Sequence, residues 1–213
     1  MPRRLPRYDR AFVRRAGFAL SCISHIEQAR LLGLRSGNEI ITLADVEYTY
    51  ELAFLRIFLA WEQLLEDALT RLICGYSRSS GLEPLRSGAK YYSTIANAEA
   101  AILGRRDYEL WHSPAQVIQR TRQFLTGSHY ELVIASASAR IAHMASIRHR
   151  IAHSQSHAER QFDAATMSLA GKRYRASRPG RFLRDWVSGA MPPCRWISAL
   201  ALDLGNLSMQ ICS

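Results

Sequence analysis

The feature that constrains the fold most is the spacing of apolar residues between about Asp45 and Ile73. They recur at intervals of three and four, as residues on one face of an α-helix do. The positions are Phe54, Ile57, Phe58, Trp61, Leu64, Leu65, Ala68 and Leu72. Gly75 follows them, and a glycine just beyond the last apolar position is typical of a helix C-terminus. This stretch therefore predicts one long helix with a buried face.

The rest of the chain also shows helical spacing, with capping residues between segments. We expect further helices at about 9–34, 94–103, 113–126, 128–153 and 156–170, and a last one after Pro192-Pro193. Ser156 to Glu159 fit a capping box at the start of one of them. Polar residues with glycines and a proline predict a loop over 76–92. The sequence thus predicts an all-α, antiparallel helical bundle with additional helices, forming a single domain over residues 1–213.

The chain is strongly basic. Its 213 residues carry a net charge of +10 with a pI near 9.9. Nearly all of this positive charge is arginine, which pairs with phosphate through two donors at once, so a polyanionic partner such as RNA is favoured. An arginine-rich surface that is merely solvated would explain the same composition.

Other sequence features bear on the cellular location of the protein. No stretch approaches the ~20 apolar residues that a membrane-spanning helix needs. The N-terminus is basic but lacks the apolar core and cleavage site of a signal peptide. The cysteines lie far apart without a C-x-x-C pair, which argues against structural zinc and a disulfide framework. They are Cys22, Cys74, Cys194 and Cys212. We expect a soluble cytoplasmic protein, not bound to membranes, with buried, reduced thiols.

Residues 148–153 read Arg-His-Arg-Ile-Ala-His and supply what RNA cleavage without a metal ion requires. An arginine holds phosphate with a permanent charge and a rigid fork of donors. A histidine titrates near neutral pH and can exchange a proton with the ribose 2′-hydroxyl or the leaving 5′-oxygen. We predict that Arg148 binds phosphate, that His153 is the general acid or base, and that His149 orients Arg148 or the substrate.

These six residues, called the Arg–His motif below, resemble the R-x4-6-H signature of the HEPN superfamily of helical ribonucleases and nucleotide-binding domains. Leu55–Asp67 is similar to the long helix of one HEPN branch, with its aliphatic-aromatic-Ala-Trp-Glu core. Trp111–Pro114 is similar to a tryptophan segment that follows in that branch. The resemblance covers about residues 45–211. His149 and Ser154 stand where Asn and Gly are frequent in the family.

The resemblance implies a metal-independent endoribonuclease that leaves a 2′,3′-cyclic phosphate and a 5′-hydroxyl end, without a cofactor, as a toxin or antiviral defence effector. HEPN ribonucleases usually dimerise so that two motifs converge on one cleft, which implies a homodimer. Family toxins are often silenced by an antitoxin, including nucleotidyltransferase-like proteins, which are candidate partners here. The alternative is a non-catalytic HEPN module that binds RNA, a nucleotide or a protein. A helical scaffold without a nucleic-acid role also stays open.

Arg148 stands where its helix calls for an apolar residue. The stripe before it consists of Ile134, Ala137, Ile141 and Met144. A charge on a packed face is costly unless it is paired or near water, and such breaches are more frequent at functional sites. Ile147 lies beside Arg148 and can continue the packing. On one ideal helix Arg148 and His153 differ by about 140°, so only a bend or a second copy of the chain would bring them together.

Residues 172–184, called the basic segment below, are the most basic stretch, with Tyr174 and Phe182 among the cations. This pattern is typical of surfaces that contact phosphates and stack on unpaired bases. Aromatic side chains that pack back into the bundle would fit it equally well. The residues predicted to contact RNA are Arg150, Lys172, Arg173, Tyr174, Arg175 and Arg181.

Other chemistry is weakly supported. Glu62 and Glu66 could orient Arg148 or His153, or they are surface acids of an amphipathic helix. Histidines 149, 153 and 157 have the spacing of a helical metal site, but the predicted helix break before residue 157 argues against it. We therefore expect no metal site. Phosphate-binding loops and nucleophile elbows are not found in the sequence.

Overall fold

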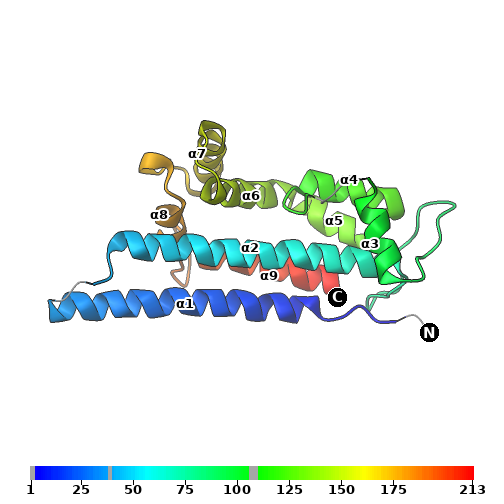
Figure 1. Ribbon diagram of the computed structural model, residues 1–213, viewed down its shortest axis with the longest axis horizontal. Coiled ribbons are helices and arrows are strands. Elements are labelled where there is room, and N and C mark those ends of the chain that lie inside the picture. The colour runs from blue at the N-terminus through cyan, green and yellow to red at the C-terminus, as the bar shows by residue number, and fades with distance from the viewer. Residues whose placement is uncertain (1–2, 38–39, 106–109) are drawn as a thin grey trace. The chain divides into compact units, whose positions relative to one another are not determined.

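The computed structural model describes residues 3–37, 40–105 and 110–213, and in these ranges its regular structure is helical (Figure 1). The elements are α1 (Tyr8–Ser36), α2 (Leu43–Ile73), α3 (Ile95–Leu103), α4 (Pro114–Phe124), α5 (His129–Ser136), α6 (Ser138–Ala152), α7 (Ser156–Ala170), the 3-10 turn η1 (Arg175–Ser177), α8 (Pro179–Arg184) and α9 (Trp196–Cys212). Extended backbone pairs there only as isolated bridges. The all-α prediction is confirmed.

Local sequence signals set most helix boundaries. The side chains of Thr94, Ser113 and Ser128 accept hydrogen bonds from backbone N–H groups in the first turns of α3, α4 and α5. Gly171 ends α7 in the left-handed conformation, with φ 67°. The predicted buried face of α2 is also confirmed, because all eight of its apolar positions are at most 3% exposed.

Two predictions about helix boundaries are wrong. The helix expected over 128–153 is two helices, α5 and α6, separated by Ala137 (φ −109°, ψ 10°). Ser136 donates a hydrogen bond from its hydroxyl to the Val133 carbonyl oxygen (2.8 Å), and such local bonds compete with the helical pattern. Helix α7 does begin at Ser156, but Gln155 occupies the cap and makes no side-chain capping bond. The capping box therefore does not form.

The chain divides into two compact units, to both of which α1, α2, α6 and α9 contribute. Unit 1 contains the chain up to Phe12 together with Trp61–Ala142 and Gly205–Ser213. Unit 2 contains Val13–Ala60 and His143–Leu204. The single domain predicted from the chain length stays a prediction.

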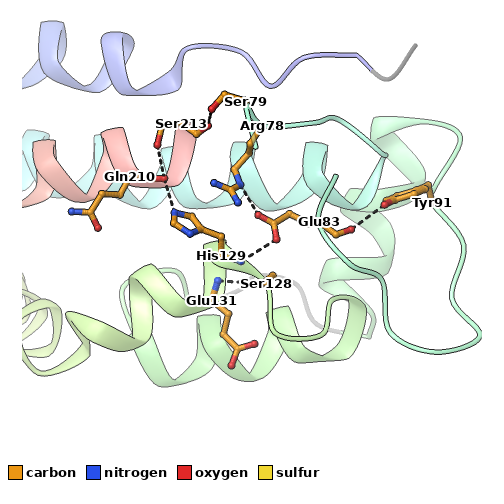
Figure 2. Close-up of polar contacts among 9 residues, drawn as sticks. All are labelled: Arg78, Ser79, Glu83, Tyr91, Ser128, His129, Glu131, Gln210 and Ser213. Carbon is orange, nitrogen blue, oxygen red and sulfur yellow. Dashed lines mark hydrogen bonds and ion pairs between the residues drawn. The ribbon is translucent and has the colours of Figure 1, made fainter. Parts of the chain in front are cut away.

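Unit 1 is held by apolar packing and by contacts of the buried carboxylate of Glu83. Fully buried Tyr130 of α5 packs on α2. Glu83, in the loop after α2, is 2% exposed and accepts hydrogen bonds from Nε of Arg78 (2.6 Å) and the backbone N–H of His129 (3.0 Å). The Tyr91 hydroxyl donates to the Glu83 carbonyl oxygen (2.9 Å), as Figure 2 shows. Glu83 thus joins the predicted loop to the start of α5.

Unit 2 packs the N-terminal half of α2 against α8. Gly180 is required here, because a Cβ at this position would lie 2.2 Å from the backbone oxygen of Glu47. The Gly180 N–H donates to Oε1 of Glu51 (2.8 Å). Phe182, two residues on, is fully buried. Helix α8 is therefore fixed tightly against α2, and the backbone that carries its arginines is held in place.

None of the helices in the described ranges has the length and apolar character needed to cross a membrane. The four cysteines are free thiols. Only Cys212 is buried, whereas Cys22, Cys74 and Cys194 are half-buried. The prediction of buried thiols is therefore wrong for three of the four.

Candidate functional site

The Arg–His motif lies in unit 2 at the C-terminal end of α6. His149 is in its last turn and His153 follows its last residue, with the backbone N–H of His153 bonded to the His149 carbonyl oxygen (2.9 Å). This spacing of four residues brings the two imidazoles together, with ring centroids 4.5 Å apart and planes inclined at 47°. His153 is exposed and His149 is half-buried. The predicted junction between two helices is thus confirmed.

The environment of His149 favours its neutral form. Its pKa is lowered, first by burial and then by the charges of His153, Arg148 and His157. A histidine with a lowered pKa is deprotonated at neutral pH. His149 is therefore able to accept a proton, which gives it more chemical capacity than the orienting role predicted for it.

Arg148 does not occupy a core position. Ile147 is fully buried and takes the place that the apolar stripe assigned to Arg148. Arg148 is half-buried, with its Nε shielded from solvent. Ile141 and Met144 are buried as the stripe predicts, but from Met144 the buried face of α6 continues by a step of three, to Ile147, and not by the step of four that leads to Arg148. Arg148 thus lies at the margin of the packed face of α6.

Arg150 faces the motif rather than open solvent. Its Nη1 donates to the His153 carbonyl oxygen (3.3 Å), beyond the end of α6. The charge of Arg150 also acts on the carboxylate of Glu51 in α2. The pKa of Glu51 is raised, first by burial and then by the negative charge of Glu47; the Gly180 N–H and the charges of Arg150 and Arg178 only partly offset this rise. Glu51 therefore lies between the end of α6 and the start of α8.

A groove of about 610 Å³ lies in unit 2, around the basic segment and the residues that follow it. The cations that line it are Lys172, Arg173, Arg175, Arg181, Arg184 and Arg195. Asp185 is the carboxylate of the lining, and Tyr174 and Trp186 complete it. We call this site the basic groove. Four of the residues predicted to contact RNA through their charge are gathered in it.

The cations of the basic groove differ in how far they are neutralised. Lys172 forms an ion pair with Asp185 (2.6 Å). Arg195 and Arg184 face Glu27 of α1 at 3.2 and 3.8 Å. Within the part of the chain that the structure describes, the side chains of the remaining three form no ion pair or hydrogen bond. These three are Arg173, Arg175 and Arg181, all exposed. They leave the groove with a positive charge available to an anionic ligand.

The aromatic residues of the basic segment pack inward. Phe182 is fully buried and Tyr174 is 7% exposed, with their ring centroids 5.3 Å apart. The Tyr174 hydroxyl donates to Oδ2 of Asp185 (2.7 Å). Burial alone would raise the pKa of Asp185, but hydrogen bonds from Lys172, Tyr174 and the backbone of Trp186 lower it. This packing fits the alternative in which the aromatic side chains of the basic segment pack back into the protein, and stacking of Tyr174 on RNA bases stays a prediction.

The sequence-based interpretation missed Trp186 and Arg195. The two are paired in an antiparallel bridge, and the bond from the Val187 N–H to the Cys194 carbonyl oxygen (2.9 Å) closes the same loop. The guanidinium of Arg195 consequently lies over the Trp186 ring, 4.3 Å from its centroid. Such a contact across a loop has no periodic signal in the sequence. Arg184 could have been found, because it belongs to the basic segment.

The carboxylates proposed as supports belong to unit 1 rather than to the unit that holds the motif. The pKa of Glu66 is raised by burial and by the charges of Asp67 and Glu99. Its electrostatic neighbours are therefore acids. The supporting role suggested for Glu62 and Glu66 stays a prediction.

Over the described ranges, no three or more His, Cys, Asp or Glu side chains gather where they could hold a metal ion. Comparison of the chain with protein-family models gave no match, and comparisons with curated proteins and with solved structures gave none either. Function must therefore be inferred from the side chains themselves.

Proposed function

We propose that this chain is an endoribonuclease of the HEPN type that cleaves RNA without a metal ion. The observation that carries the proposal is the 4.5 Å contact between the rings of His149 and His153, beside Arg148. Unit 2, which holds this pair, also holds the basic groove. Two adjacent imidazoles, one kept neutral by its surroundings, are suited to taking up and delivering protons in phosphodiester cleavage.

In the proposed reaction neutral His149 accepts the proton of the ribose 2′-hydroxyl. The 2′-oxygen then bonds to the neighbouring phosphorus, the bond from phosphorus to the 5′-oxygen breaks, and His153 gives a proton to that oxygen. Arg148 stabilises the negative charge that builds up on the phosphate. The products are a 2′,3′-cyclic phosphate and a 5′-hydroxyl end. This scheme divides between two histidines the proton transfer first assigned to His153.

The proposal includes the assembly and biological role that the HEPN resemblance implies. The exposure of His153 leaves room for a second copy whose motif faces the same substrate. A toxin or defence role, with an antitoxin that silences it, belongs to the same proposal. Sedimentation of the purified protein tests the dimer, and co-purification with the product of an adjacent open reading frame tests the antitoxin.

The decisive experiment is cleavage of single-stranded RNA by purified protein in EDTA. The His153→Ala and His149→Ala variants should each lose about 10²–10⁴-fold in rate, the usual contribution of a general acid or base. Arg148→Lys should rescue little, because an ammonium cannot bind phosphate through two parallel bonds. His25→Ala, at an exposed position of α1, is the matched control and should cleave normally. The proposal fails if both motif variants cleave like wild type, or if RNA with a 2′-deoxy residue at the cleaved position is cut equally well.

A non-catalytic RNA-binding module is the second candidate. The basic groove favours it, because its three arginines that lack an ion pair within the described ranges can hold a phosphate backbone without any chemistry at the motif. Tight RNA binding by wild type, with no product in any substrate panel, would select this function over the ribonuclease.

A further inference from the structure

Trp186 is the exposed tryptophan of this chain. Trp186 is 53% exposed, whereas Trp61, Trp111 and Trp196 are 0, 7 and 5% exposed. Leaving a large aromatic ring in water forgoes much hydrophobic stabilisation, and such rings are common where a ligand covers them. The ring of Trp186 is therefore available to a ligand.

The ring of Trp186 is held in place from one side. The guanidinium of Arg195 lies 4.3 Å from its centroid. Arg195 itself is fixed by donating to the carbonyl oxygen of Arg184 (2.6 Å) and by its contact with Glu27 (3.2 Å). The Trp186 backbone N–H donates to Oδ1 of Asp185 (2.9 Å). One face of the indole is thus covered by a fixed cation, and the ring loses little freedom on binding a ligand.

A second cavity adjoins the basic groove at Trp186. It measures about 310 Å³ and shares Trp186 and Lys172 with the groove. The rest of its lining is largely apolar, with Leu169 and Val187 among its members. Arg195 lines the basic groove but not this cavity, whereas Trp186 and Lys172 line both. Trp186 therefore lies between the cationic groove and a cavity whose other lining residues are mainly apolar.

We propose that Trp186 stacks on an unpaired base of single-stranded RNA whose phosphates are bound by Arg173, Arg175 and Arg181. The charge of the basic groove and the largely apolar lining of the second cavity match the two parts of a nucleotide, its phosphate and its base. A positively charged groove combined with a stacking platform is how proteins bind single strands without reading their sequence. The choice of RNA rests on the proposed function, whereas the stacking geometry does not depend on cleavage.

The site also predicts which nucleic acids are excluded. In a duplex the bases are stacked on one another and paired, so none is free to enter the second cavity. Inorganic polyphosphate has the charge but no base. Single-stranded RNA should therefore bind more tightly than either, and the difference should depend on Trp186.

The test uses a 2′-O-methyl oligoribonucleotide, which lacks the attacking hydroxyl, so that binding is measured without cleavage. By fluorescence anisotropy Trp186→Ala should bind this strand about 10- to 100-fold more weakly, since stacking on one aromatic contributes that much. Trp186→Phe should retain most of the affinity. Arg181→Ala should weaken binding of both the strand and polyphosphate, whereas Trp186→Ala should leave polyphosphate binding unchanged. Arg14→Ala, at an exposed position of α1, is the control for charge and should change neither.

Tryptophan emission gives a second readout, because Trp186 is the ring that solvent quenchers reach. Strand binding should quench this emission and protect it from iodide, and Trp186→Phe should remove the response. The proposal is overturned if Trp186→Ala binds the strand like wild type, if duplex binds as tightly as single strand, or if a free mononucleotide binds as tightly as the strand. Loss of cleavage in His149→Ala with these binding results intact would separate failure at the motif from failure at the groove.

Discussion

The salt dependence of RNA binding should report how many groove cations are free. Lys172 is paired with Asp185, and Arg184 and Arg195 share Glu27, so their charges are already partly neutralised. When a cation without an internal partner binds an RNA phosphate, the counterion that had been bound to that phosphate is released. Among the described residues, three groove side chains have no such partner, the arginines at 173, 175 and 181.

For a single strand the logarithm of the binding constant falls with the logarithm of salt concentration by about 0.7 per neutralised phosphate. Three free arginines therefore predict a slope of about −2 and roughly a 20-fold loss of affinity between about 50 and 200 mM salt. Six equivalent cations would give a slope of about −4 and roughly a 300-fold loss. The two cases are easily separated.

Anisotropy titrations of the 2′-O-methyl strand over this salt range measure the slope. Each Arg→Ala substitution at 173, 175 or 181 should flatten it by about 0.7, and the triple variant should flatten it by about 2. Lys172→Ala should change it much less, because its charge is already matched by Asp185. A triple variant that keeps the wild-type slope, or a Lys172 variant that loses as much as an arginine variant, would refute this assignment of free and paired charges.

Three further predictions concern the motif and the scaffold. The pKa of His149 lies below its usual 6.5, so the cleavage rate should decrease only when the pH drops below about 6.5. The free energy of unfolding should also decrease as the pH falls through that value, because the unfolded chain then binds a proton more readily than folded His149 does, and His149→Gln should remove this loss. Glu83→Ala should lower the free energy of unfolding in urea by about 3–5 kcal/mol, because it leaves the Arg78 side chain, 9% exposed, without its counter-charge. A loss below about 1 kcal/mol would contradict this. Replacing both residues with Leu should recover most of the lost stability. Gly180→Ala should destabilise the chain by about 1–3 kcal/mol and weaken RNA binding, since the added Cβ meets backbone that cannot move aside; unchanged stability and binding would show that α8 is less fixed than the contact indicates.

Local patterns determined the secondary structure of this protein. The buried face of α2, the side-chain caps at Thr94, Ser113 and Ser128, and the glycine stop at Gly171 all depend on residues within a few positions of each other. Interactions over this range can be predicted from the spacing of residue types along the sequence. The same applies to the pairing of His149 with His153, which are one helical turn apart.

The tertiary structure decided which side chains are available for binding. From spacing alone Tyr174 and Trp186 are both aromatic residues near cations, yet Tyr174 packs on Phe182 while Trp186 stays exposed under Arg195. Sequence also could not tell that Lys172 is paired with Asp185, whereas Arg181 is exposed and has no ion pair with the residues that the structure describes. Burial and ion pairing depend on contacts between residues far apart in the chain, and such contacts have no fixed spacing. The charge of the basic groove was thus foreseeable, whereas its shape and its stacking platform required the fold.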